Sequence, residues 1–310
     1  MSSTPTSDRR SRDVDERTRH RDGRRRRWLA PVTILVVLGI VGGSAYAVWT
    51  KLQSELFSPS CTATVSGGSV TFSPEQVANA ALIAAVSDKR GLPPRAASIA
   101  ITTSIQESKL RNVNYGDRDS VGLFQQRPSM KVWGTREQIL DPVHSANVFY
   151  DALVKVEGYE SMVITEVAQK VQKSAYPDAY ADHEQEGRTL ASTLRGQTPA
   201  GFVCQLRPAT TVSSAATVAA DLDAQLGVKA TVDGSTLTIS APSDQLAWAA
   251  GQWGVARAEA YGVDRVQVGD RAWTRGTGGS AESWSTGESA PSPTTVTIRL
   301  ATPAACLHPG

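Results

Sequence analysis

The longest uncharged stretch of the chain runs from Trp28 to Thr50 and is mostly apolar. A helix rises about 1.5 Å per residue, so a stretch of this length can cross the hydrocarbon core of a bilayer. Trp28, Tyr46 and Trp49 lie near its two ends, where amphipathic rings favour the membrane interface. The pattern predicts a single transmembrane helix over residues 28–50.

The residues before this stretch, 1–27, contain ten arginines and five acidic residues, a net charge of +5. Because the whole chain carries +2, the remainder carries −3. The segment has few apolar residues, so we expect a disordered cytoplasmic tail and export of everything after Lys51. The alternative is a signal peptide cleaved near Ala47, which would release a secreted protein. The tail lacks interleaved aromatic residues, and we expect no nucleic-acid partner.

Short helical periods separated by polar loops follow, up to about residue 204. Ser73 is a suitable N-cap and predicts a helix over 73–87. A second helix is predicted from Pro93 to Leu110, with an apolar residue at every fourth position. Further helices are predicted at 135–138, 142–157, 161–174 and 182–194. This middle section is therefore predicted to be mainly α.

The pattern changes after residue 206 to alternating helices and strands. Helices are predicted at 212–226 and 244–261, and strands at 228–232, 236–240, 263–268 and 296–300. The α-β-β-α-β-β order predicts a smaller α+β domain. Residues 276–293 are rich in Gly, Ser, Thr and Pro and predict a mobile loop. Four tryptophans could stack on sugars, although core packing is the expected role of the first two: Trp248, Trp253, Trp273 and Trp284.

Three cysteines occur, and none is spaced for a zinc or redox motif. In an oxidising exterior, a Cys61–Cys204 disulfide would close the middle section almost end to end. Pairing of Cys204 with Cys306 stays open, because connectivity cannot be read from sequence. The four histidines are scattered and no phosphate-binding loop occurs, so no metal and no cofactor are expected.

Glu107 lies near the C-terminal end of the second predicted helix, on a face with the small residues Ala100, Thr103 and Ser104. The partial negative charge of a helix C-terminus disfavours a carboxylate and predicts a raised pKa for Glu107. A glutamic acid protonated near neutral pH can act as a general acid. Taken alone, a glutamate at this position would be read as a solvated helix residue.

A second segment, Ser120 to Gln126, follows after a polar stretch. Gly122 permits an unusual backbone conformation or the close approach of a ligand. Gln125 and Gln126 offer amide groups suited to N-acetyl groups and hydroxyls. Taken alone, this segment would also be read as a helix start after a glycine turn.

Together, Glu107-Ser108 and Gly122-Leu123-Phe124-Gln125 resemble the Glu-Ser and Gly-Leu-Met-Gln motifs of the lysozyme-like lytic transglycosylase family, with Phe124 in place of the usual Met. The family's third motif, Ala-Tyr-Asn, falls at Lys170-Val171-Gln172. The family's tyrosine helps to hold the catalytic glutamate, and Val171 has no group that can do so. Tyr176 and Tyr180 are the alternatives for that role.

The resemblance implies a mainly α lysozyme-like domain over 61–206, followed by the smaller α+β accessory domain over 211–306. It also implies cleavage of the bond between N-acetylmuramic acid and N-acetylglucosamine in peptidoglycan, with Glu107 as the catalytic residue. A 1,6-anhydro product would make the enzyme a lytic transglycosylase, and hydrolysis would make it a muramidase. The implied substrate-binding residues are Ser108, Ser120, Gly122, Phe124, Gln125, Gln126 and Gln172.

Asp117 and Asp119, in the polar stretch between the motifs, are candidates to orient water, because standard glycosidases use two carboxylates. Turn formation is the other interpretation of these aspartates. A different class of function is also open: a non-catalytic envelope scaffold that binds peptidoglycan, with an accessory domain that binds an envelope protein. In both cases the expected partners are glycan strands and, through one helix, the membrane.

Overall fold

The computed structural model describes residues 57–172 and 177–302. The predicted tail, the predicted anchor and Cys306 lie outside these residues, as does Tyr176. In the described part of the chain, no helix has both the length and the apolar character needed to cross a membrane. The chain divides into two compact units, Met1–Ser58 and Pro59–Gly310, and the description below concerns the second. Its described residues form nine α-helices and two antiparallel sheets, a mixture of helix and sheet.

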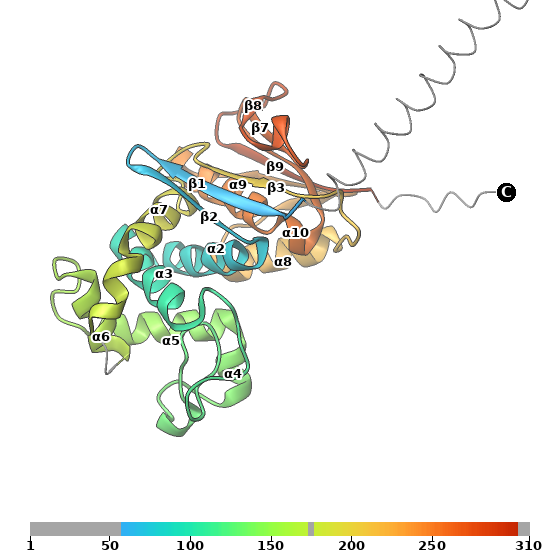
Figure 1. Cartoon of the computed structure of the whole chain (residues 1–310). Coiled ribbons are helices and arrows are strands. Elements are labelled where there is room, and N and C mark those ends of the chain that lie inside the picture. Colours follow the sequence, from blue (N-terminus) through green and yellow to red (C-terminus); the bar gives the residue numbers. More distant parts are fainter. Residues whose placement is uncertain (1–56, 173–176, 303–310) are drawn as a thin grey trace, which may run out of the picture. The chain divides into compact units, whose positions relative to one another are not determined.

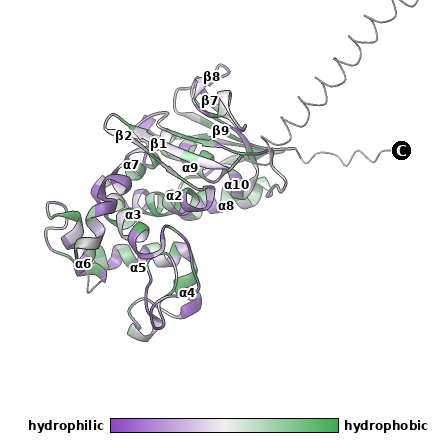
Figure 2. Ribbon diagram, viewed as in Figure 1, coloured by the Kyte–Doolittle hydropathy of each residue, from purple (hydrophilic) through white to green (hydrophobic). Residues whose placement is uncertain are grey.

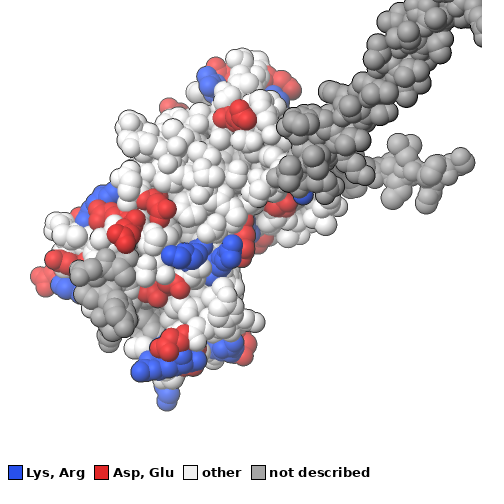
Figure 3. Space-filling view, viewed as in Figure 1, with Lys and Arg blue, Asp and Glu red and all other residues white. Residues whose placement is uncertain are grey.

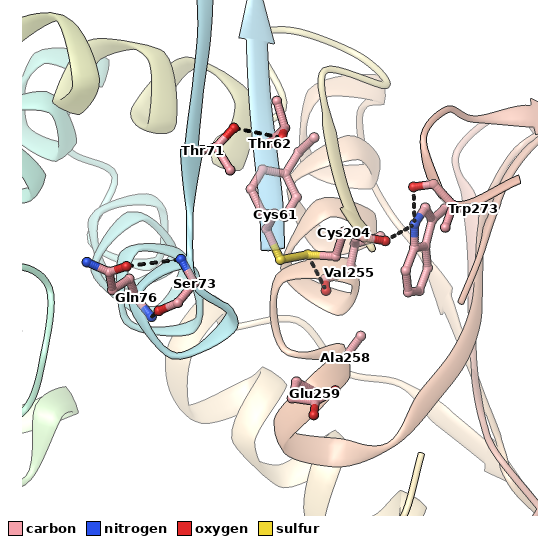
Figure 4. Close-up of a disulfide and its surroundings, with 12 residues drawn as sticks. Cys61, Thr62, Thr71, Ser73, Gln76, Cys204, Val255, Ala258, Glu259 and Trp273 are labelled. Atoms are coloured by element: carbon pink, nitrogen blue, oxygen red, sulfur yellow. Dashed lines mark hydrogen bonds between the residues drawn. A yellow bond between two sulfur atoms is a disulfide. The ribbon is translucent and has the colours of Figure 1, made fainter. Parts of the chain in front are cut away.

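The smaller sheet joins the two ends of the middle section. It contains β1 (Ser60–Val65), β2 (Gly68–Phe72) and β3 (Phe202–Gln205) in the order β2-β1-β3. Cys61 lies directly opposite Cys204 in the β1–β3 register, and the two form a disulfide (Figure 4). The predicted pairing is therefore confirmed. The sequence pattern predicted no strand before the first helix, and the hairpin of β1 and β2 was therefore missed.

The middle section is mainly helical, as predicted, and its first helix begins with the predicted cap. Ser73 accepts a hydrogen bond from the backbone N–H of Gln76, and the Gln76 side chain accepts one from the backbone N–H of Ser73. The elements are α2 (Pro74–Lys89), α3 (Pro94–Ser108), η1 (Pro128–Met130), α4 (Arg136–Leu140), α5 (Pro142–Leu153), α6 (Ile164–Gln172), η2 (Pro177–His183) and α7 (Glu184–Leu194).

Helices α3 and α7 pack closely. A β-carbon at Gly187 of α7 would come within 2.0 Å of Thr102 Oγ1 in α3. Only a glycine allows this approach. In Figure 1, α4, α5 and α6 lie at the end of the unit opposite to β7 and β8.

The larger sheet has six strands in the order β4-β5-β9-β6-β7-β8. The strands predicted at 236–240, 263–268 and 296–300 are confirmed to within one residue at each end. The helix predicted at 212–226 and the strand predicted at 228–232 both begin three residues later, and the helix predicted at 244–261 is divided into two at Arg257. The hairpin partner β7 was not predicted, and the segment expected to be a loop contains η3 and β8. The elements are α8 (Ala215–Leu226), β4 (Thr231–Asp233), β5 (Thr236–Ser240), α9 (Asp244–Ala256), α10 (Ala258–Tyr261), β6 (Val263–Val268), β7 (Arg271–Thr274), η3 (Gly279–Ala281), β8 (Ser285–Thr286) and β9 (Thr295–Leu300).

Side chains from α2 and α9 link the helical section to the larger sheet. Lys89 Nζ, at the end of α2, donates to the carbonyl of Asp223 in α8 at 2.9 Å. Gln252 Nε2, in α9, donates to the carbonyl of Thr193 in α7 at 2.5 Å. The green that marks apolar residues in Figure 2 is found on both α2 and α9. The apolar core therefore runs from the helical section into the α+β section.

Three of the four tryptophans proposed as sugar platforms belong to this core. Trp273 and Trp284 are buried, and each indole N–H donates to a backbone carbonyl, that of Cys204 and that of Phe202. Trp253 is also buried, whereas Trp248 is partly exposed and packs edge-on against Trp284. Core packing, the expected role of Trp253, is confirmed. Sugar stacking by Trp273 and Trp284 is contradicted, because their buried ring faces have no access to a ligand.

Candidate active site

Glu107 lies in the last turn of α3, next to Ser108 at the helix end, and is partly buried. The predicted position near a helix C-terminus is confirmed. The Tyr180 hydroxyl, from η2, donates a hydrogen bond of 2.6 Å to Glu107 Oε1. Tyr180 is 1% exposed, so this phenol is held by its surroundings. Tyr180, which was considered as a replacement for the tyrosine missing at Val171, therefore contacts the carboxyl.

Gln172 brings a second polar group to the carboxylate. Its side chain is hydrogen-bonded to Glu107. Its Nε2 also donates to the backbone carbonyl of Phe124 at 2.5 Å. Gln172 is the last residue of α6. Its amide therefore joins three segments: α3, α6 and the Gly122 loop, residues 120–126. The sequence analysis assigned Gln172 to substrate, whereas the structure places it against the acid.

Burial raises the pKa of Glu107, and the hydrogen bonds from Tyr180 and Gln172 oppose this effect. A carboxylate that loses water pays a desolvation cost, so the neutral acid is favoured until hydrogen bonds compensate. The predicted direction is confirmed, but its cause is burial rather than the helix end. A raised pKa keeps Glu107 protonated to a higher pH than an exposed glutamate.

Two serines of α3 attach the helix that carries Glu107 to the Gly122 loop. The hydroxyls of Ser104 and Ser108 both donate to the carbonyl of Leu123, at 3.0 and 2.8 Å. The hydroxyl expected to bind substrate at Ser108 is therefore already engaged. Sequence analysis missed Ser104 as a tether, although its spacing of four from Ser108 places both serines on one helix face.

Gly122 has a backbone conformation that requires glycine, as predicted. Its φ is +82°, and a β-carbon there would lie 2.9 Å from the carbonyl oxygen of Ile139. Its N–H donates to the carbonyl of Val113 at 2.7 Å. The glycine thus allows the loop to pass close to the end of α4.

Several side chains that the sequence assigned to substrate lie in the core. Phe124 is fully buried and its ring stacks on Phe149 with centroids 4.4 Å apart. Gln126 is 2% exposed, and both of its amide atoms are hydrogen-bonded to Ser145. Ser120 is also buried. Substrate contact by the Phe124 and Gln126 side chains was therefore a wrong expectation, because packing and hydrogen bonding already occupy them.

Gln125 has the opposite orientation and is partly exposed. Its φ is +48°, and its Nε2 donates to the carbonyl of Tyr115 at 3.2 Å. Tyr115 itself is 72% exposed. Of the two adjacent glutamines, Gln125 is the one that a ligand can reach.

Replacing Gln126 by Ala should lower stability by about 2 kcal/mol, because Ser145 loses its partners inside the core. Gln125→Ala is the matched control, and its melting temperature should stay close to that of the wild type, since Gln125 is partly exposed. Thermal unfolding of both variants measures the difference. An equal effect of the two substitutions would contradict the core position of Gln126.

Of the two aspartates considered as water-orienting groups, Asp119 stabilises the loop through its side chain. Asp119 accepts hydrogen bonds from the Ser129 backbone N–H at 2.7 Å and from Arg127 Nε at 2.9 Å. These bonds hold the pKa of Asp119 well below its ordinary value, and the bond from the Ser129 backbone contributes most. Asp117 is exposed and lies 3.9 Å from Arg118. The turn-forming interpretation therefore fits this geometry.

The surface around these loops carries charges of both signs. On the face shown in Figure 3, basic and acidic residues are interspersed, with no broad patch of one sign. In the described ranges, 57–172 and 177–302, no group of three or more His, Cys, Asp or Glu side chains is arranged to hold a metal ion.

No protein-family model matches the chain, and no curated protein was found to be similar to it.

Proposed function

We propose that this protein cleaves the glycan strands of peptidoglycan with Glu107 as its single acid and base. The observation that carries the proposal is the environment of Glu107: a partly buried carboxyl with a raised pKa, bonded to Tyr180 and Gln172. A solvated helix glutamate would have neither the burial nor the two partners. Such pKa-shifted carboxyls are typical of catalytic sites, although structural networks also produce them.

Glu107 protonates the oxygen that links N-acetylmuramic acid to N-acetylglucosamine, and the bond to the muramoyl C1 breaks. The resulting carboxylate is stabilised by the hydrogen bond from Tyr180. It then takes a proton from the muramoyl 6-hydroxyl, whose oxygen attacks C1 and closes a 1,6-anhydro ring. Asp119 is engaged by Arg127 and Ser129, which disfavours a second carboxylate that activates water. This favours the lytic transglycosylase over the muramidase.

The exported location belongs to the same proposal. A disulfide such as Cys61–Cys204 persists in oxidising compartments and is rare in the cytosol. Peptidoglycan lies outside the cytoplasmic membrane, so the cysteine pair supports an extracytoplasmic position for the folded unit. We propose that residues 28–50 anchor it there.

The test is to incubate the chain, purified in mild detergent, with isolated peptidoglycan and to analyse released muropeptides by mass spectrometry. Anhydro-muropeptides support the transglycosylase, and products with reducing ends indicate a muramidase. If folded protein releases neither product but sediments with peptidoglycan, the non-catalytic scaffold replaces the enzyme. The scaffold would agree with the burial of Phe124 and Gln126, which removes two of the expected substrate contacts.

Tyr180→Phe should shift the pH dependence of glycan cleavage. The Tyr180 hydrogen bond lowers the pKa of Glu107, so its loss raises that pKa further. An acid that must be protonated then stays active to higher pH, so the alkaline limb of the pH–rate profile shifts to higher pH. The maximal rate should fall about tenfold, because the carboxylate loses a charge-assisted hydrogen bond.

Tyr150→Phe is the control for this substitution. Tyr150 is fully buried and donates to the carbonyl of Ile83, so it also loses a hydrogen bond but has none with Glu107. Its pH profile should match that of the wild type. An unchanged alkaline limb in Tyr180→Phe would argue against Glu107 as the titrating acid.

A further inference from the structure

The helix that carries Glu107 is followed by two residues in a backbone conformation that residues other than glycine rarely adopt. Lys109 has φ +56° and Leu110 has φ +58°. Glycine is the usual residue at a left-handed helix end, because a β-carbon there crowds the backbone. Such strain persists only where the surrounding structure holds it, and it is concentrated at functional sites.

Backbone hydrogen bonds tie this turn back onto the last turn of α3. The N–H of Lys109 donates to the carbonyl of Ile105 at 2.9 Å, and that of Leu110 to the carbonyl of Ser104 at 3.1 Å. The Leu110 side chain is fully buried, so a glycine there would lose core packing. The turn therefore fixes where the helix stops, one residue after Glu107.

Two amides of α2 hold the turn from outside. Gln76 Nε2 donates to the carbonyl of Lys109, and Asn79 Nδ2 donates to the carbonyl of Leu110, each at 2.8 Å. Gln76 Oε1 also accepts the backbone N–H of Ser73, 3.0 Å away, in the capping box of α2. One amide group thus joins the start of α2 to the end of α3.

We propose that Gln76 and Asn79 are positioning residues for Glu107. They hold the strained turn that ends α3, and thereby keep the Glu107 carboxyl where Tyr180 and Gln172 can reach it. Those partners come from η2 and α6, which are separate from α2, so the helix end needs its own support. The inference deepens the proposed function and depends on it for its kinetic consequences.

Gln76→Glu tests the proposal with almost no change in shape. A glutamate at this position still completes a capping box, since its oxygen can accept the Ser73 N–H. It no longer donates to the Lys109 carbonyl, and its negative charge faces that oxygen. We expect kcat to fall about tenfold with KM unchanged, because the acid is misplaced but the glycan still binds. Asn79→Asp should act in the same direction.

Gln138→Glu is the matched control. Gln138 caps α4 in the same way, with its Oε1 2.9 Å from the backbone N of Thr135, so the chemical change is identical. Its kcat should equal that of the wild type. A substitution that only weakens a helix cap would lower the melting temperature in both variants and leave kcat unchanged.

Lys109→Gly added to Gln76→Glu should restore kcat. Glycine adopts a positive φ without strain, so the turn can form without the amide from α2. Recovery to within about twofold of the wild type supports the positioning role, given the permissive backbone of glycine. If kcat in Gln76→Glu is normal, or is low and not restored by glycine, the proposal is overturned.

A readout that needs no activity separates this inference from the proposed function. Carbon-13 NMR titration of the Glu107 carboxyl reports its pKa directly. If the wild type cleaves no glycan, the proposed function fails. The positioning role still holds if Gln76→Glu shifts the pKa of Glu107 and Gln138→Glu does not. If neither substitution shifts it, the positioning role fails as well.

Discussion

Glu107→Gln should lower the rate of muropeptide release by about 10³-fold, within the range that general acid–base catalysis contributes. Glutamine has nearly the same shape but cannot give a proton to the glycosidic oxygen. The Tyr180 hydroxyl can still donate to the amide oxygen, so the site should keep its geometry. The measurement is the initial rate of product release from purified peptidoglycan at several pH values.

The same variant should be at least as stable as the wild type near neutral pH. Burial raises the folded-state pKa of Glu107, so the stability linked to its proton is present at low pH and is lost as pH rises through that pKa. A neutral glutamine has no such loss. Between acidic and neutral pH, the melting temperature of Glu107→Gln should therefore lack the decrease that titration of Glu107 causes in the wild type. If Glu107→Gln melts at a lower temperature than the wild type, its inactivity does not support Glu107 as the acid, because unfolding also removes activity. A variant that stays folded and active would remove Glu107 from the mechanism.

Loss of the Cys61–Cys204 disulfide should have the largest effect on stability. The bond joins residues 143 positions apart, so it removes much conformational freedom from the unfolded chain. On the chain-entropy model such a closure contributes about 5 kcal/mol, a large part of the stability of an ordinary domain. Both cysteines are 1% exposed, so Cys61→Ala/Cys204→Ala also leaves a small gap in the core.

Thermal and denaturant unfolding of the double variant, with and without reductant, measures this contribution. Reductant should lower the melting temperature of the wild type and leave that of the double variant unchanged. Cys306→Ala is the control and should unfold like the wild type. The Cys61–Cys204 disulfide joins β1 to β3, so the rate of muropeptide release per folded molecule should change little. If the double variant is as stable as the wild type, the bond is dispensable.

The local features of the site followed from the sequence because each depends on neighbouring residues. The helix that ends beside Glu107 and the glycine turn at Gly122 are set by short-range sterics and periodicity. Four of the later strands followed in the same way from the alternation of apolar and polar residues. The hairpin of β1 and β2 did not, because its strands are short and β1 is stabilised by pairing with β3, far along the chain.

Gln125 and Gln126 show where sequence reasoning stops. They are adjacent and chemically identical, yet Gln125 is partly exposed and Gln126 is buried. The difference comes from the isolated bridge between Val121 and Gln126 and from the left-handed backbone at Gln125. An irregular loop has no periodicity, so the direction of each side chain is decided by the tertiary contacts on either side of it.

By itself, the sequence determined which residue to test, Glu107, because this follows from residue type and position. For the cysteines it left two pairings open, and the structure decided for Cys61–Cys204. Only the tertiary structure decided how the carboxyl is perturbed and held. Its raised pKa comes from burial among packed helices, and its partners Tyr180 and Gln172 come from other elements. The hydrogen bonds from Gln76 and Asn79 to the turn after α3 also join elements that are distant in sequence. Burial and hydrogen bonding between segments distant in sequence depend on how the chain packs, and this is why the tertiary fold was needed to see them.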